Sequence, residues 1–218
     1  MPRSLPLLCP PLAATLALFV TLAPGQVRAE DAAPLKTAEL SARLYQIGQA
    51  TEDPVLIIAA AKLRKSLALE PVARAPAEPG AAATATAPLA WEAMLDSAAA
   101  LATDDPGLTR LIEDIRAESD KGMLTGPVYS ISGIRAGGND TYPGLAFQGG
   151  AYAEIYVEGE GVSDLNLYVF DEKDRLVCSD TDISDIAYCG WRPASSASFT
   201  VSVENTGSAA NSYSLMTN

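Results

Sequence analysis

The strongest repeating pattern in the chain lies in residues 150–159 and 163–171, which read Gly-Ala-Tyr-Ala-Glu-Ile-Tyr-Val-Glu-Gly and Ser-Asp-Leu-Asn-Leu-Tyr-Val-Phe-Asp. In both stretches one set of alternate positions is small or aliphatic. Alternation with period two over this length is typical of β-strands that bury one face. Similar stretches predict further strands near residues 128–134, 144–148, 175–179, 185–190, 199–204 and 212–217. About eight short strands separated by turn residues predict an antiparallel β-sandwich over residues 127–218.

The preceding region, residues 35–122, is rich in Ala, Leu, Glu and Arg and has helical spacing. Four apolar stripes recur at i, i+3, i+4 and i+7, which predicts four amphipathic helices. The stripes are Leu40, Leu44 and Ile47; Leu56, Ala60, Leu63 and Leu67; Trp91, Leu95, Ala98 and Ala102; and Leu108, Leu111, Ile112 and Ile115. Asp53-Pro54 and Asp105-Pro106 each place an N-cap acceptor before a proline that suits the first turn.

These signals predict one helix hairpin in residues 30–69 and a second in residues 89–122, with Gly122 as the stop of the last helix. Between them, residues 70–88 contain four prolines, one glycine and almost no bulky apolar side chain. This composition predicts a mobile Ala/Pro-rich linker. The chain as a whole is therefore expected to be α+β, with two helix hairpins followed by a sandwich.

Residues 1–29 have the pattern of a secretory signal peptide. Arg3 is followed by an uncharged apolar stretch over residues 11–24, and Val27-Arg28-Ala29 loosely fits a cleavage site. The alternative is a membrane anchor, because 24 residues separate Arg3 from Arg28 and could span a bilayer. Prolines interrupt this run, which favours cleavage after Ala29, a mature protein without a membrane span, and a periplasmic or secreted location.

The composition excludes several classes of function. The 218 residues include no histidine, so a Ser-His-Asp set and any His-ligated metal site are impossible. The net charge is −12, and it becomes −14 without residues 1–29, which hold two arginines and no acid. An acidic protein of this kind repels nucleic acid, so no nucleic-acid partner is expected.

Cys178 and Cys189 are the only cysteines after residue 29. In an exported protein such a pair favours a disulfide, and two neighbouring strands joined as an antiparallel hairpin would place the residues side by side. Two buried thiols and a two-cysteine metal site are the alternatives, although carboxylates make poor co-ligands for thiolate-preferring metals.

Acidic residues crowd the segment that contains these cysteines. Asp171, Asp180, Asp182 and Asp185 form a weak candidate site for Ca²⁺, a hard cation that prefers carboxylate oxygens. The spacing fails the EF-hand pattern, which requires a glycine and a glutamate at fixed positions. The alternative is a solvated acidic loop that protects a sheet edge, and this is the interpretation we favour. No other cofactor is expected.

A row of aromatic side chains faces away from the aliphatic face of the two alternating strands. Its members, Tyr152, Tyr156, Tyr168 and Phe170, are candidate binding residues, because exposed aromatic rings on a sandwich face can hold sugar rings or protein partners. The alternative is that this face is also buried, under the helical region, and a large exposed apolar patch would be unusual in a monomer.

Three stretches resemble the bacterial pre-peptidase C-terminal domain, over roughly residues 128–218. They are residues 150–159, residues 163–171, which are close to the family's Asp-Leu-Asp-Leu-Tyr strand, and residues 199–205 followed by 211–215. Asn166 replaces the second Asp of that strand, and residues 195–198 lack the family's usual Gly before an aromatic residue. The resemblance implies a jelly-roll-like sandwich, export, and ligand or matrix binding. It does not imply proteolysis, because the helical region is too short for a peptidase and lacks histidine.

Together these features predict an exported, non-enzymatic binding or interaction protein with an unidentified protein or glycan ligand. The competing class is an accessory or modulator subunit of a separate secreted hydrolase.

Overall fold

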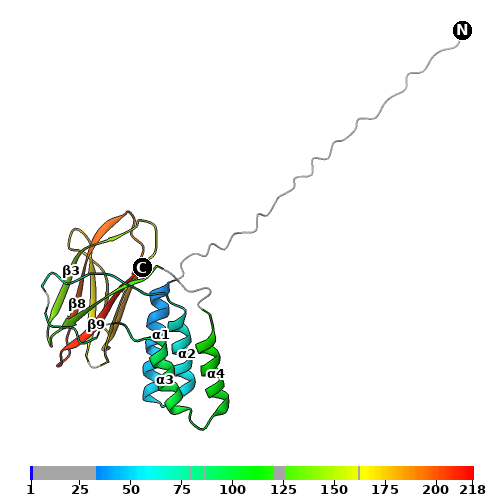
Figure 1. The fold of residues 1–218 in the computed structure, drawn as a ribbon. Helices are drawn as coiled ribbons and strands as arrows, with labels where there is room; N and C mark the ends of the chain where they lie inside the picture. The colour runs from blue at the N-terminus through cyan, green and yellow to red at the C-terminus, as the bar shows by residue number, and fades with distance from the viewer. Residues whose placement is uncertain (2–32, 79, 86, 120–125, 162) are drawn as a thin grey trace. The chain divides into compact units, whose positions relative to one another are not determined.

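A computed structural model describes residues 1, 33–78, 80–85, 87–119, 126–161 and 163–218 (Figure 1). The expected signal peptide and the expected helix stop at Gly122 therefore lie outside the described residues, Met1 excepted. The described part of the chain is α+β, with four helices and a two-layered β-sandwich, as the sequence predicted.

The four helices are α1 (Pro34–Ala50), α2 (Pro54–Lys65), α3 (Trp91–Leu101) and α4 (Pro106–Ala117). Both predicted caps are present. The Asp53 carboxylate accepts from the amides of Val55 and Leu56, and the Asp105 carboxylate accepts from Gly107 and Leu108. Each acid satisfies amides that have no partner inside the helix and lies at its positive end, so it fixes where the helix begins.

The helices share a small apolar core. Its fully buried members include Ile57, Met94, Leu95 and Ile115. The stripe predicted for α1 was wrong at two of its three residues, because Leu40 and Ile47 are about half exposed at 50% and 51%, whereas Leu44 packs against this core. Helix α1 instead buries its shorter side chains, Leu35, Ala38 and Ala42, which allow it to approach a sheet closely.

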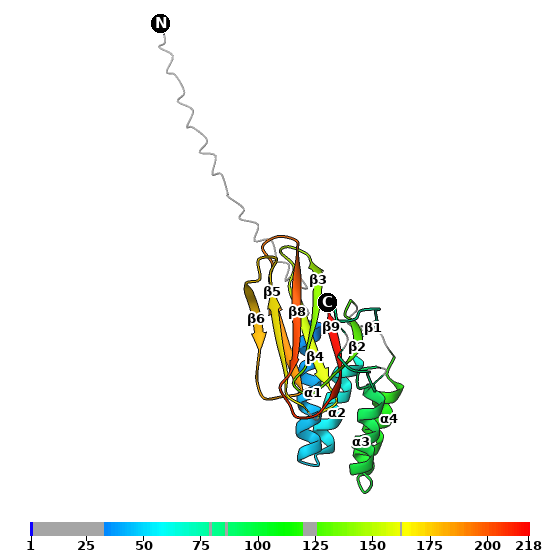
Figure 2. The ribbon, with the colours of Figure 1, turned by 90° about the vertical axis from the view of Figure 1, so that its left-hand side faces the viewer.

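The strands are β1 (Glu70–Pro71), β2 (Val128–Ile134), β3 (Asn139–Phe147), β4 (Ala153–Gly159), β5 (Leu165–Phe170), β6 (Leu176–Asp180), β7 (Ile186–Trp191), β8 (Ala197–Asn205) and β9 (Asn211–Thr217). They form a five-stranded sheet in the order β1-β2-β9-β4-β7 and a four-stranded sheet in the order β3-β8-β5-β6. Figure 2 shows β3, β8, β5 and β6 as one layer and β2, β9 and β4 as the other. Every pairing is antiparallel except that of β1 with β2.

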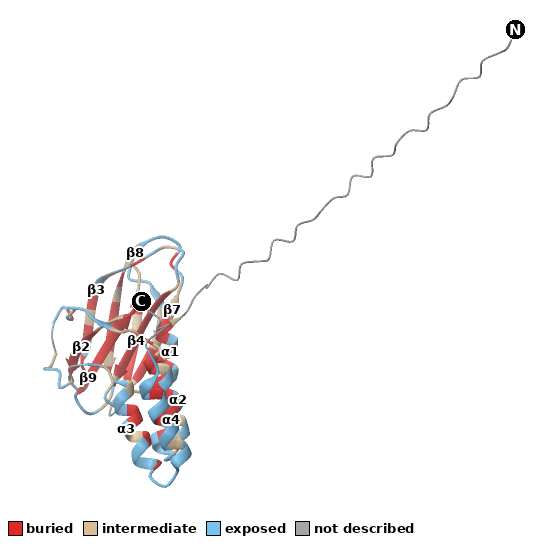
Figure 3. Ribbon diagram, turned by 45° about the vertical axis from the view of Figure 1, so that its right-hand side comes forward, coloured by how far each residue is buried: buried red, intermediate tan, exposed pale blue. Residues whose placement is uncertain are grey.

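The sandwich core lies between the two sheets. Inward side chains such as Ile155, Leu167 and Val203 are fully buried. Burial follows the strands and the inner sides of the helices, whereas the outer sides of the helices are exposed (Figure 3). Among the described residues, no helix combines the length and apolarity needed to cross a bilayer.

The described residues of 70–88 differ from the mobile linker that their composition predicted. Glu70 and Pro71 pair with β2 as β1, the amide of Val72 donates to Tyr129, and that of Ala77 donates to Thr141 on β3. Further along, Ala81 bridges Gly133. The segment therefore adds β1 outside β2 and also bonds to the edge strand β3, and it covers backbone groups that could otherwise pair with other chains.

The Cys178–Cys189 disulfide is present, with Cα atoms 5.9 Å apart, a normal span for such a bond. The expected hairpin geometry was wrong, because Cys178 lies on β6 and Cys189 on β7, which belong to different sheets. The disulfide therefore ties the two sheets together on the side opposite β2 and β3.

Candidate functional site

Helix α1 packs on the outer face of the five-stranded sheet. The apolar contact joins Leu35, Ala38 and Ala42 of the helix to Tyr156 on β4 and Met216 on β9. Tyr156 is fully buried there. The helical layer thus covers one face of the sandwich and places several polar side chains at the boundary.

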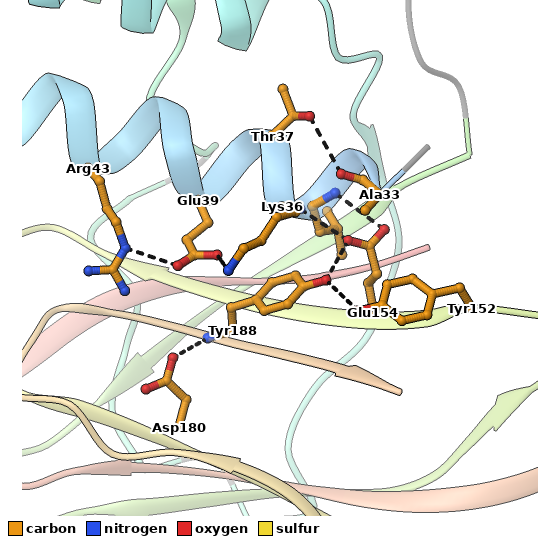
Figure 4. Close-up of polar contacts among 10 residues, drawn as sticks. Ala33, Lys36, Thr37, Glu39, Arg43, Tyr152, Glu154, Asp180 and Tyr188 are labelled. Atoms are coloured by element: carbon orange, nitrogen blue, oxygen red, sulfur yellow. Dashed lines mark hydrogen bonds and ion pairs between the residues drawn. The ribbon is translucent and has the colours of Figure 1, made fainter. Parts of the chain in front are cut away.

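Glu154 on β4 caps the N-terminus of α1 (Figure 4). Helix α1 has no side-chain cap of its own, and the Glu154 carboxylate accepts from the amides of Leu35 at 3.5 Å and Lys36 at 3.1 Å. The Tyr188 hydroxyl donates to the same carboxylate at 2.9 Å. A carboxylate at the positive end of a helix stabilises the helix. Here it also joins that end to the sheet.

Burial raises the pKa of Glu154, although the hydrogen bonds from Tyr188 and from the helix amides oppose the shift. A buried carboxylate with a raised pKa is a common feature of catalytic acids. In this protein both oxygens accept hydrogen bonds from the helix amides, and the Asn218 amide donates to one of them at 3.4 Å. The structure therefore accounts for Glu154 as a helix cap.

A buried ion pair forms a second link between the layers. Arg64 Nη2 of α2 lies 2.7 Å from Glu158 Oε2 of β4, and the two side chains are only 3% and 8% exposed. Arg64 also donates to the Ser41 hydroxyl at 3.4 Å and to the Ala38 carbonyl at 3.4 Å. These extra acceptors offset part of the cost of removing the guanidinium from water.

A pocket of about 510 Å³ lies beside this ion pair. Helix α1 contributes Tyr45 and Gln46, residues 85 and 87–90 form a second wall, and the sheet contributes Glu158 together with the neighbouring Glu160. The pocket's volume falls within the range of small-ligand sites. Burial raises the pKa of Asp185, which also lines the pocket, and the Glu158 charge adds to this shift while a hydrogen bond from Gln46 opposes it.

The structure does not bring the four predicted aromatic residues together. Tyr152 and Tyr156 lie on the side of the five-stranded sheet that faces α1, where Tyr156 is buried and Tyr152 is half-buried beside Tyr188. Tyr168 and Phe170 lie on β5 in the other sheet. The single row was wrong because β4 and β5 are consecutive in sequence but belong to opposite layers of the sandwich.

Tyr168 and Phe170 form a stacked pair on the outer face of the four-stranded sheet. Their ring centroids are 6.4 Å apart and their planes differ by 21°. In the sheet register Tyr168 is opposite Ser202 and Phe170 is opposite Thr200. Both rings are half-buried, and the helices pack on the other sheet. We call this surface the open face. It comprises Tyr168, Phe170 and Thr200, which are half-buried, together with Ser202 and Asn166, which are buried.

The predicted acidic cluster does not assemble into a cation site. The Asp171 carboxylate accepts from the backbone amide and the side chain of Arg175 within its own turn. Asp180 accepts from the Tyr188 amide, and Asp185 accepts from the Gln46 side chain. Asp182 is exposed. Among the described residues no group of three or more potential ligands could hold a metal ion.

The sequence interpretation missed the residues that join the two layers. Glu154 and Glu158 are four residues apart on one strand and therefore share a face with Tyr156. Charged residues that alternate with buried ones are usually solvated, so the pattern alone did not indicate that helices cover this face. Arg64 and Lys65 followed an apolar run and resembled an ordinary basic helix end.

No family model matches the chain, and no curated protein matches it. Among solved structures it is similar to the pre-peptidase C-terminal domain of a collagenase from Bacillus anthracis, with 15% identity, 44% of this chain and 90% of that chain covered, and a TM-score of 0.34. It is also similar to a periplasmic inhibitor of g-type lysozyme from Aeromonas hydrophila, with 13% identity, coverage of 42% and 84%, and a TM-score of 0.33. A third match is a carbohydrate-binding module of a laminarinase from Zobellia galactanivorans, with 14% identity, coverage of 39% and 76%, and a TM-score of 0.26.

The domain family that the sequence resembles is thus among the structures to which the chain is similar. At these identities and TM-scores the matches bear on neither ligand nor activity, which must be argued from the chain's own residues.

Proposed function

We propose that this chain is an exported, non-enzymatic binding protein that holds a glycan on the open face of its sandwich. The observation that carries this proposal is the Tyr168–Phe170 stack, which presents two nearly parallel rings on a sheet face away from the helices. Flat aromatic surfaces of this kind pack against the apolar faces of sugar rings.

The neighbours of the stack favour a polar, hydroxyl-rich ligand. Thr200, which is paired with Phe170, is half-buried and offers a hydroxyl group beside the rings, whereas Ser202 and Asn166 on the same face are buried. Hydroxyl and amide groups both donate and accept hydrogen bonds, as sugar hydroxyls do. Glu204 accepts from Tyr168 at 3.4 Å and gives this end of the open face an acidic character, which favours a neutral glycan over an anionic one.

Two features support export, and two support a non-catalytic role. Residues 1–29 have the pattern of a signal peptide, and the Cys178–Cys189 disulfide is typical of oxidising compartments. The sequence has no histidine, and the buried carboxylate Glu154 serves as a helix cap.

Affinity gel electrophoresis of the full chain tests this function. Native gels containing xylan, laminarin or galactomannan should slow the wild-type protein in at least one case, and Y168A/F170A should migrate freely. Y152A is the matched control, because it removes a half-buried tyrosine from the other sheet. It should be slowed as much as the wild type.

Equal migration of wild type and Y168A/F170A in all three gels would contradict the proposal. A secreted hydrolase recovered by the wild type and not by Y168A/F170A would instead place the protein in the accessory class.

A further inference from the structure

The pocket between α1, residues 85 and 87–90 and the five-stranded sheet has a lining of two chemical kinds. Tyr45, Pro88 and Leu89 form an apolar and aromatic wall. The lining also includes three acidic residues, Glu158, Glu160 and Asp185. At about 510 Å³ the pocket could enclose a small molecule or one long side chain with its flanking backbone.

The charges of the pocket lining are all negative. No lysine or arginine is among the lining residues, and Arg64, which pairs with the lining residue Glu158, is engaged in that ion pair. Glu160 and Asp185 form no ion pair among the described residues; they accept hydrogen bonds from the Thr84 hydroxyl and the Gln46 amide. An anionic ligand would therefore be repelled, and a cation would relieve the mutual repulsion of the carboxylates.

The wall formed by residues 85 and 87–90 is attached near both ends, and near its later end the Leu89 carbonyl accepts from Arg64 at 3.5 Å. The amide of Thr84 donates to the Ser212 hydroxyl at 2.6 Å, and the Ala85 amide donates to the same oxygen at 3.4 Å. A pre-formed site loses little conformational freedom when it binds.

We propose that this pocket is a second binding site, distinct from the open face, and that it takes an alkylammonium group. The aliphatic part of the ligand would lie on Tyr45, Pro88 and Leu89, and the ammonium would lie between Glu160 and Asp185. Two sources share this chemistry, a free linear polyamine and a lysine side chain of a peptide.

Isothermal titration calorimetry with the full chain at low salt tests the proposal, with spermidine and acetyl-Gly-Lys-Gly-amide as probes. At least one probe should bind, and added salt should weaken the binding. E160Q and D185N should each weaken it by roughly tenfold or more, since each removes a charge-assisted hydrogen bond. Binding of one probe and not the other identifies the source.

D182N is the matched control, because it makes the same charge change in the same loop at an exposed residue outside the pocket. It should bind like the wild type, and melting temperatures should show that all variants are folded. Absence of binding by both probes would overturn the proposal. Equal weakening in D182N and D185N would also overturn it, because the attraction would then come from net charge alone. Y168A/F170A should bind the probes normally, which separates this site from the open face.

Discussion

Among single residues, buried charged side chains link the helices to the sandwich and to one another. Arg64 and Glu158 pair at 2.7 Å across the boundary, and Glu154 caps α1 from the sheet. Lys65, next to Arg64, donates to the carbonyls of Ile115 and Glu118 at 2.5 and 2.9 Å and so caps the C-terminal end of α4. Each charge therefore satisfies backbone or ionic groups that would otherwise be buried without a partner.

The buried ion pair should be costly to break from one side. E158Q or R64M should lower the free energy of unfolding by about 3–5 kcal/mol, because the remaining group loses its partner in a buried site. The double variant R64M/E158M should recover much of this loss, since no charge stays unpaired. Urea denaturation measures all three, and a double variant less stable than both single variants would contradict this account.

Stability should depend on pH in an unusual direction near neutrality. Burial raises the pKa values of Asp140, Glu154 and Asp185 above their ordinary values near 4. The folded protein therefore binds protons more readily than the unfolded chain, so the stabilisation is complete below these ordinary values and is lost as the pH rises through the folded pKa values. The free energy of unfolding should thus rise as the pH falls from neutrality toward these ordinary values.

Asp171 acts in the opposite direction in a lower range. Hydrogen bonds from Arg175 lower its pKa to about 2, so its contribution is lost only as the pH falls from about 4 toward 2. Chemical denaturation at pH 5, 6 and 7 tests the stabilisation expected from Asp140, Glu154 and Asp185. E154Q should make the free energy of unfolding depend less steeply on pH in this range. A wild-type stability that falls from pH 7 to pH 5 would contradict it.

At the scale of elements, residues 70–82 behave as an edge cover. A Cβ added at Gly133 would collide with the backbone of Ala82, so only glycine allows this close approach. G133V should destabilise the protein by about 1–3 kcal/mol through overpacking.

Amide hydrogen exchange can show where G133V destabilises the protein. The amides of Val72 and Ala77 donate to the edge strands and should be protected in the wild type. In G133V the Ala77 amide should lose its protection from exchange, while the amides of the sandwich core remain protected for longer. Exchange of these amides at the unfolded rate in the wild type would show that the segment is not bound to the sheets.

The disulfide is the other element-level constraint. It closes a loop with a sequence separation of 11 residues and ties β6 to β7 across the sandwich. Chain-entropy reasoning gives a stabilisation of about 3 kcal/mol for a loop of roughly this size. C178S/C189S should therefore melt several degrees lower and keep its fold, as circular dichroism can show. An unchanged melting temperature would contradict this.

The sequence predicted the helices and strands better than it predicted which of them pack together. Local signals such as the Asp53 and Asp105 caps and the period-two strands depend on nearby residues, and the structure has them. The sheet to which each strand belongs depends on long-range pairing. The sequence therefore did not show that Tyr156 and Tyr168 lie in different sheets, or that Cys178 and Cys189 do. Residues 70–88 have few bulky side chains whose pattern could predict contacts. In the described part of this segment the main chain makes most of the hydrogen bonds, and these leave no signal in the sequence.

At the scale of the whole molecule, the helices cover one face of the sandwich and leave the other sheet free. This asymmetry explains why two of the four predicted aromatic residues lie on the side that faces α1 while Tyr168 and Phe170 lie on the open face. It also explains why the candidate site could be predicted only in part. The aromatic residues were visible in the sequence, but the pocket beside α1 is built from segments far apart in the chain.

Amide chemical shifts measured during a titration can locate the glycan that we propose binds to the open face. Nitrogen-15-labelled full-length protein would be titrated with whichever of xylan, laminarin or galactomannan slows it in gels, and with all three if none does. We predict that shift changes concentrate in β5, β6 and β8 around Tyr168, Phe170 and Ser202, and that Y168A/F170A abolishes them. No shift changes with any of the three, or changes confined to the five-stranded sheet and the helices, would contradict this proposal.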